Sequence, residues 1–170
     1  ASGPETVSFT LAPGTSRDVN LNFEFKSFLR AQELPGIVNY TLSSGEKRQI
    51  QFTLSLPSSM FIVGKKISAE VLATLAREKS IPHLSSTLVT YKGKIDDVNE
   101  VARAISKLIH VSVVERIEDE VYQMYGQSAQ DHHVAVQVKT KGTKEATVEL
   151  RCSDDALGTS LITEIHRLLK

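Results

Sequence analysis

Few side chains in this sequence have the types and spacing that catalysis or metal binding requires. His132 and His133 are adjacent in a predicted β-strand, so their side chains point to opposite faces and are poorly placed to share one metal ion. Cys152 precedes Asp154 and Asp155, whose negative charges disfavour a thiolate, so we expect a packed structural cysteine. These residues predict no metal site and no nucleophile.

An acidic group at Glu115 and residues 118–120 lacks the spacing and the central glycine of a calcium loop. The sequence also contains no glycine-rich phosphate loop and no G-x-S-x-G motif. We therefore expect a protein that is not an enzyme, with no catalytic residues and no cofactor.

The features that could serve binding are lysines in predicted turns and tyrosines in predicted strands. Such lysines could contact an acidic peptide or a phosphoinositide headgroup, although lysines in turns commonly just face solvent. The tyrosines could line a peptide groove or belong to the core. The lysine clusters are Lys65 with Lys66, Lys92 with Lys94, and Lys139 with Lys141 and Lys144; the tyrosines are Tyr91, Tyr122 and Tyr125.

Composition narrows the class of protein. The chain has 170 residues, a formal net charge of zero and one cysteine. Zero net charge removes the usual electrostatic footprint of a nucleic-acid binder. No apolar run is long enough to span a bilayer. A lone cysteine forms no internal disulfide and fits a reducing, cytosolic setting.

The first third of the chain predicts strands without helices. Apolar and polar residues alternate in four runs, which favours an antiparallel β-sandwich. An immunoglobulin-like sandwich uses about seven strands, so residues 1–58 are either a small sandwich or only the C-terminal strands of a larger one. The runs are Val7–Leu11, Val19–Phe25, Ile37–Leu42 and Ile50–Leu56, with a turn at Pro13 and Gly14.

The remaining chain, after a break at Pro57–Ser59, mixes strands and helices. We therefore predict an α+β fold, in which an N-terminal antiparallel β-sandwich (1–58) precedes a mixed α/β platform (59–170) of about five strands and three helices. A hairpin of Val134–Val138 and Val148–Leu150, turning near Gly142, precedes the last helix. The helices are predicted near Ile67–Leu75 with Ser68 as N-cap, over Val98–Ile109 after Asp97, and over Leu157–Leu169 with Ser153 or Asp154 as N-cap.

Five short segments occur in an order and spacing that resemble a known family. They are Phe9–Gly14, Ala31–Leu34, Ser112–Arg116 (SVVER), His132–Val134 (HHV) and Cys152–Asp154 (CSD). Together they resemble the C-terminal appendage, or ear, domains of the delta-adaptin family, large subunits of adaptor-protein complex three. The resemblance covers nearly the whole chain and implies a β-sandwich followed by an α/β platform.

The resemblance also implies a place for a docking site. In the better-known clathrin-adaptor appendages, a tryptophan on the first platform helix organises peptide docking, and Leu75 occupies its place here. This sequence contains no tryptophan, so the resemblance implies a site with different specificity. We predict that protein binding involves Leu75, Arg77, Tyr91 and Lys92.

The function implied by the resemblance is that of a non-enzymatic appendage recruiting accessory proteins to a vesicle coat, in sorting from endosomes or the trans-Golgi network to lysosomes. Its implied partners are the other subunits of the heterotetrameric adaptor complex and accessory, tethering or SNARE proteins, with no nucleic acid and only indirect membrane association. The implied location is cytoplasmic and peripheral on Golgi, endosomal and coated-vesicle membranes. The alternatives are an appendage of another coat, such as coatomer gamma, and a headgroup or nucleic-acid binding module with strongly salt-dependent binding.

Overall fold

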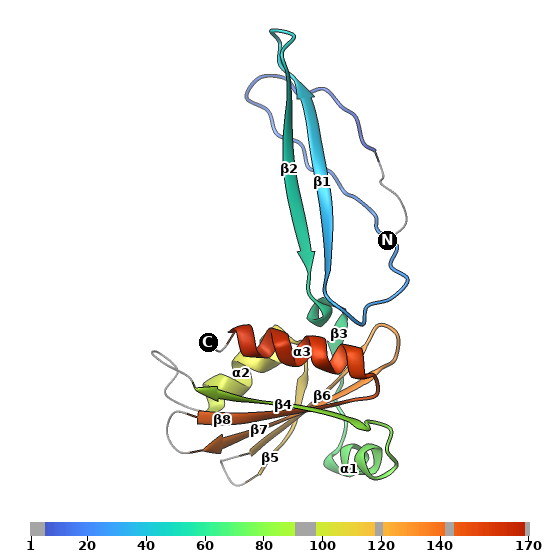
Figure 1. Cartoon of the computed structure of the whole chain (residues 1–170), viewed down its shortest axis with the longest axis vertical. Coiled ribbons are helices and arrows are strands. Elements are labelled where there is room, and N and C mark those ends of the chain that lie inside the picture. Colours follow the sequence, from blue (N-terminus) through green and yellow to red (C-terminus); the bar gives the residue numbers. More distant parts are fainter. Residues whose placement is uncertain (1–5, 91–97, 118–120, 142–144, 169–170) are drawn as a thin grey trace.

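The computed structural model describes residues 6–90, 98–117, 121–141 and 145–168, and confirms the predicted α+β class. The strands are β1 (Gln32–Thr41), β2 (Lys47–Leu56), β3 (Ile62–Gly64), β4 (His83–Thr90), β5 (Ser112–Ile117), β6 (Val121–Ser128), β7 (His133–Lys141) and β8 (Glu145–Cys152). The helices are the 3-10 helix η1 (Ser58–Phe61), α1 (Ala69–Arg77), α2 (Val98–Leu108) and α3 (Asp155–Leu168). In Figure 1 the β1–β2 hairpin projects from a platform made of the other elements.

The platform sheet has six strands and is antiparallel, with β3-β6-β7-β8-β4 as its main order and β5 also paired to β6. β3 pairs with the last residues of β6 and β5 with the first ones, so β3 and β5 lie end to end along one side of β6. Sequence reasoning missed β3, because three residues are too few to show an alternating pattern.

Two glycines make the junction of β3, β5 and β6 possible. Gly64 and Gly126 are opposite each other in the register. A Cβ atom at Gly64 would lie 2.5 Å from the Ser112 hydroxyl oxygen, and one at Gly126 would lie 3.0 Å from a methyl carbon of Ile62. A Cβ at Gly64 would force Ser112 to move, and one at Gly126 would be in unusually tight contact, so the close approach of these strands favours glycine.

One face of the sheet is buried beneath α2 and α3 (Figure 1). The inward-facing residues of β7 and β8 alternate with outward-facing ones, as the sequence predicts for this hairpin. The helices contribute residues spaced three or four apart, which fall on one helical face. The buried set includes Val134, Val136, Val138, Val148 and Leu150 from the strands, and Val101, Ile105, Leu157, Leu161 and Ile165 from the helices.

The helix α3 begins where the sequence predicts. The backbone N–H of Leu157 donates to Oδ1 of Asp154 at 2.9 Å, so Asp154 rather than Ser153 is the N-cap. Ser153 instead accepts the backbone N–H of His133 at 2.9 Å. The first helix is capped as predicted, with the N–H of Val71 donating to Ser68 Oγ at 3.3 Å. Asp97, the predicted cap of α2, lies outside the described residues.

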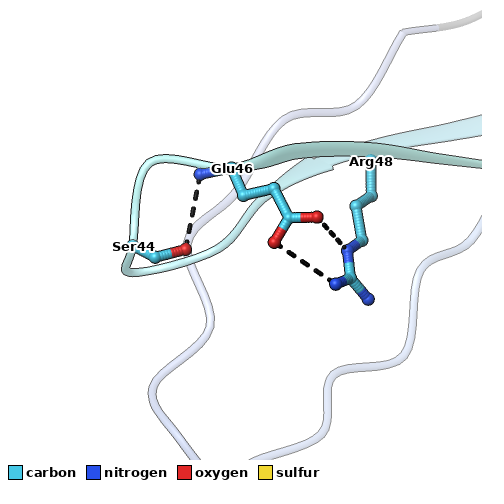
Figure 2. A network of polar contacts seen from close by, with 3 residues as sticks. All are labelled: Ser44, Glu46 and Arg48. Carbon is cyan, nitrogen blue, oxygen red and sulfur yellow. Dashed lines mark hydrogen bonds and ion pairs between the residues drawn. The ribbon is translucent and has the colours of Figure 1, made fainter.

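The hairpin β1–β2 is amphipathic. Its register places Leu34 opposite Leu54 and Val38 opposite Ile50 on one face, while the other face carries mainly polar pairs such as Asn39 and Gln49. Its turn is fixed by polar contacts near Gly45, which has φ of 84°. Figure 2 shows the Glu46 carboxylate accepting two hydrogen bonds from the Arg48 guanidinium, at 2.9 and 3.2 Å, and Ser44 Oγ accepting the Glu46 N–H.

The strands predicted at Val7–Leu11 and Val19–Phe25 are not formed, since residues 6–31 contain no strand. The predicted turn does form, with the Thr15 N–H donating to the Ala12 carbonyl and a φ of 74° at Gly14. An alternating pattern marks a face for burial, but a strand also needs a neighbouring backbone to pair with. The six apolar side chains from Val7 to Phe23 that would fill this face are 39–48% exposed.

The platform holds the base of the hairpin through α3. The carboxylate of Glu164 accepts the N–H of Ser58 at 2.7 Å and that of Ser59 at 3.3 Å, and both serines are buried. The rings of Phe28 and Phe61 stack with centroids 4.1 Å apart. The chain thus passes from β2 into β3 through a fixed connection. The division into separate units at 1–58 and 59–170 stays a prediction.

We predict that Gly126→Val lowers the free energy of unfolding by about 1–3 kcal/mol, because the new side chain overlaps Ile62 and Val111. Urea unfolding followed by circular dichroism measures the change. The matched control is Val113→Ala in β5, whose side chain is exposed and should leave the midpoint almost unchanged. An unchanged midpoint for Gly126→Val would contradict the packing described at this junction.

Candidate functional site

The second face of the platform sheet is covered only in part, by α1 (Figure 1). Leu72 on α1 is buried against a small cluster with Ile81, Tyr125 and Ala135. This cluster anchors the helix to the sheet. The next groove-facing residues on α1 are Ala73 and Ala76, whose short side chains leave space between helix and sheet.

A groove of about 170 Å³ occupies that space, and we call it the α1 groove. Its apolar lining comes mainly from Leu72, Ala73, Ala76, Ile81 and Ala135, and its polar lining from Gln123, Gln137, Glu149 and Arg151. The polar residues lie on β6, β7 and β8 and point away from the main core, because they alternate with its buried residues. The groove therefore combines an apolar part with a polar wall.

The polar wall is a row across the sheet. Gln123 lies opposite Gln137, and Gln137 lies opposite Glu149. Glu149 Oε1 is 3.5 Å from Nζ of Lys139, so its charge is partly balanced. Both side chains are partly exposed to solvent, which keeps this ion pair weak.

Arg151 is the one groove residue with an uncompensated charge within the described part of the chain. It lies opposite Ala135 on β7 and opposite Leu84 on β4. Its side chain has no ion pair or hydrogen bond with any described residue. A guanidinium beside an apolar surface can bind a carboxylate through two parallel hydrogen bonds.

The predicted binding residues fall in different places. Leu75 is half-buried and packs with Ile67 and Val114 against the cluster around Leu72, so it helps to hold α1 in place. Arg77 is exposed and donates a hydrogen bond to Thr74 Oγ1 at 3.2 Å. Tyr91 and Lys92 lie outside the described residues. A role in binding for these four residues stays a prediction.

The two other tyrosines are structural. Tyr122 belongs to the main core, and its hydroxyl donates to Asn99 Oδ1 on α2. Tyr125 is buried under α1, and its hydroxyl is 2.5 Å from Nδ1 of His133. Burial raises the pKa of the Tyr125 phenol. Sequence reasoning left open whether these residues line a groove or a core, and the structure places both in packed clusters.

Other residues that could carry chemistry are dispersed in the described part of the chain. No three His, Cys, Asp or Glu side chains there come together closely enough to hold a metal ion. No described helix is both long and apolar enough to cross a membrane. Lys65 and Lys66 are exposed, whereas residues 118–120 and Lys92, Lys94 and Lys144 of the predicted clusters lie outside the described residues.

Cys152 is the last residue of β8 and is fully buried against α3. Burial raises the pKa of its thiol to about 11, and the charge of Asp154 contributes less. The prediction of a packed cysteine is thus supported, although the main cause is loss of solvent and not the acidic neighbours. A thiol in this environment is protonated at neutral pH and is a poor nucleophile.

Sequence reasoning missed the α1 groove. Its residues come from α1, the loop before β4, and the outward-facing positions of three strands that are distant in sequence. The one available indication was the pair of alanines on a predicted amphipathic helix. Which strand residues face these alanines across the groove depends on the register of the strands, and the sequence alone does not specify that register to the residue.

Comparison with known proteins identifies relatives of this chain. Residues 59–170 match the family described as the AP3 Mu C-terminal domain. The chain is also similar to AP-3 complex subunit delta-1 of Bos taurus, with 29% identity over 166 residues. That alignment covers 96% of this chain and 13% of the relative, so the chain spans a small part of that protein's length. Both findings support the resemblance to a delta-adaptin ear.

We predict that Cys152 in the folded protein reacts very slowly with a thiol-specific disulfide reagent at pH 8, because the thiol is buried and its pKa is about 11. In urea the thiol should react rapidly, since its pKa returns toward the ordinary value. The absorbance of the thiolate that is released from the reagent measures both rates. Equal rates in the folded and unfolded protein would contradict the burial described here.

Proposed function

The chain belongs to the AP3 Mu C-terminal domain family, and on that premise we propose that it is a protein-interaction appendage of a vesicle-coat adaptor that binds short peptides in the α1 groove. The observation that supports this proposal is the groove itself, where Arg151, which pairs with no described acidic residue, lies beside an apolar lining. An apolar recess with a few polar groups is the usual form of a ligand site.

The size of the groove favours peptide side chains as ligands. Sites for cofactors and drug-sized molecules usually enclose about 300–1,000 Å³, whereas the α1 groove has about 170 Å³. A groove of this size accommodates one or two aliphatic side chains of a peptide whose backbone stays at the surface. This supports a docking function, and we propose that the domain is not an enzyme.

The charge of the groove indicates the composition of the peptide. Arg151 can pair with a carboxylate, while Ala73, Ala76 and Ile81 offer an aliphatic contact surface. Glu149 at the same wall is already close to Lys139. We therefore propose a peptide in which an acidic residue is adjacent to an aliphatic one. Among the described residues, no aromatic side chain lines the groove, so the proposed contacts are aliphatic and ionic.

The groove is on the side of the sheet that α2 and α3 leave free (Figure 1). A peptide can therefore bind without displacing the main core or the connection to the hairpin. Such contacts are small, and single affinities in the micromolar range are typical of small, transient interfaces. Many copies on one coat would multiply the effective affinity.

We further propose that, in the full-length protein, this domain works alongside the other subunits of an adaptor complex of the AP-3 type. Its ligands would be accessory, tethering or SNARE proteins that act in transport from endosomes or the trans-Golgi network to lysosomes. Association with those membranes would then be indirect, through the complex. The similarity to AP-3 complex subunit delta-1 favours this assignment over a coatomer appendage.

We predict that Arg151→Glu weakens the binding of a synthetic peptide with two glutamates beside a leucine by about tenfold or more, which corresponds to about 1.4 kcal/mol. Charge reversal replaces attraction by repulsion at the groove. Fluorescence anisotropy measures the affinity, and raising the salt concentration should weaken binding to the wild type because exposed charges are screened.

The matched control for this experiment is Arg167→Glu, which makes the same change at an exposed position on α3, away from the groove. It should leave the affinity almost unchanged. Equal binding by wild type and Arg151→Glu would contradict the proposed site. A higher affinity for phosphoinositide-containing vesicles or for oligonucleotides than for the peptide would favour the headgroup or nucleic-acid alternative.

A further inference from the structure

The two edges of the platform sheet differ in how well they are protected against pairing with another strand. An edge strand exposes backbone N–H and C=O groups that can pair with a further strand. Proteins commonly protect such edges with short strands, bulges, prolines or charges. One edge of this sheet has these features, and the other does not.

The protected edge is formed by β3 and β5. β3 has only three residues. β5 carries Glu115 and Arg116, and its register with β6 shifts between Val113 and Glu115, which indicates a bulge. A flat strand cannot readily extend the sheet on this side.

The unprotected edge is β4. Its eight residues, HLSSTLVT, contain no Lys, Arg, Asp, Glu or Pro. Its pairing with β8 is continuous from His83 opposite Cys152 to Thr90 opposite Glu145. Among the described residues, β4 pairs with β8 alone, so its other side is open for backbone pairing.

Two leucines on β4 add an apolar contact to this open edge. Leu84 and Leu88 are 53% and 51% exposed. They lie opposite Arg151 and Thr147, and therefore point to the same face as the α1 groove. Ser85 and Thr87 point to the other face, where α3 packs and Nδ1 of His166 is 3.1 Å from Thr87 Oγ1.

We propose that β4 accepts an extended segment of a partner protein as an added antiparallel strand. The segment carries apolar side chains four residues apart, which lie beside Leu84 and Leu88, and small polar side chains between them. Backbone hydrogen bonds supply affinity and the alternate side chains supply specificity. This second docking mode is distinct from the α1 groove and does not depend on it.

A single strand fits this edge better than a second copy of the domain. On the helix side α3 lies directly over β4, with Ser85 Oγ only 3.8 Å from a Cβ placed at Gly158. A second copy paired through β4 would have to bring its own α3 alongside this helix. An extended peptide needs only the edge and the leucine face.

The test uses a soluble, uncharged synthetic peptide with two leucines four residues apart and threonines between them. We expect it to bind the protein and to slow backbone amide exchange in β4, measured by hydrogen–deuterium exchange. The same peptide, N-methylated at alternate residues so that it cannot complete the ladder, should bind at least about tenfold more weakly.

The variants Leu84→Lys and Leu88→Lys introduce an edge charge of the protective kind and should each weaken binding about tenfold or more. The matched control is Val113→Lys on β5, which is 52% exposed at the opposite edge and should have no effect. Slowed exchange in β4 without slowed exchange in α1 separates the edge from the α1 groove. Circular dichroism confirms that each variant is folded.

Three outcomes would overturn the proposal. The first is no binding of the peptide up to about millimolar concentration, which is the weak limit for such contacts. The second is equal binding of the N-methylated peptide, or protection that appears on α1 instead of β4. The third is that the protein alone dimerises in sedimentation experiments and Leu88→Lys abolishes that dimer, since a second copy would then occupy the edge.

Discussion

The platform depends on the burial of one sheet face beneath two helices. Valines and leucines at alternate positions of β7 and β8 meet helical residues such as Ile105 and Leu161, and the whole set is almost completely removed from water. Burial of this kind is the dominant favourable term in folding. Since α2 and α3 occupy this face, a partner of the platform sheet can contact the opposite face or the β4 edge. The same helix α3 also holds the base of the hairpin through Glu164.

The sequence was sufficient to predict the elements that depend on local pattern. The hairpin of β7 and β8, the start of α3 after Asp154 and the Ser68 cap follow from periodicity and from the chemistry of helix ends. The α1 groove was not predictable, since Ala73 and Arg151 come together only through the packing of α1 on a sheet whose strands are distant in sequence. In residues 7–11 and 19–25 the prediction of strands was wrong. Apolar and polar residues alternate clearly there, but no strand forms because no neighbouring backbone pairs with them.

The arrangement explains how a domain with few chemically active residues can serve a coat adaptor. In the described part of the chain, the residues that could hold a metal ion are dispersed, while Cys152 is packed in the core and Tyr125 beneath α1. The α1 groove offers a recess with an apolar lining and the guanidinium of Arg151. These properties suit weak and reversible peptide binding, which many copies on a coat can strengthen.

Chemical-shift mapping of the ¹⁵N-labelled protein can show whether a peptide binds in the proposed α1 groove. On titration with an acidic, leucine-containing peptide, we expect the largest shifts at the groove, in the amides of Ala73, Ala76, Gln137 and Arg151. Shifts that cluster instead on α2 and α3, or on the apolar face of the β1–β2 hairpin, would contradict the proposed site.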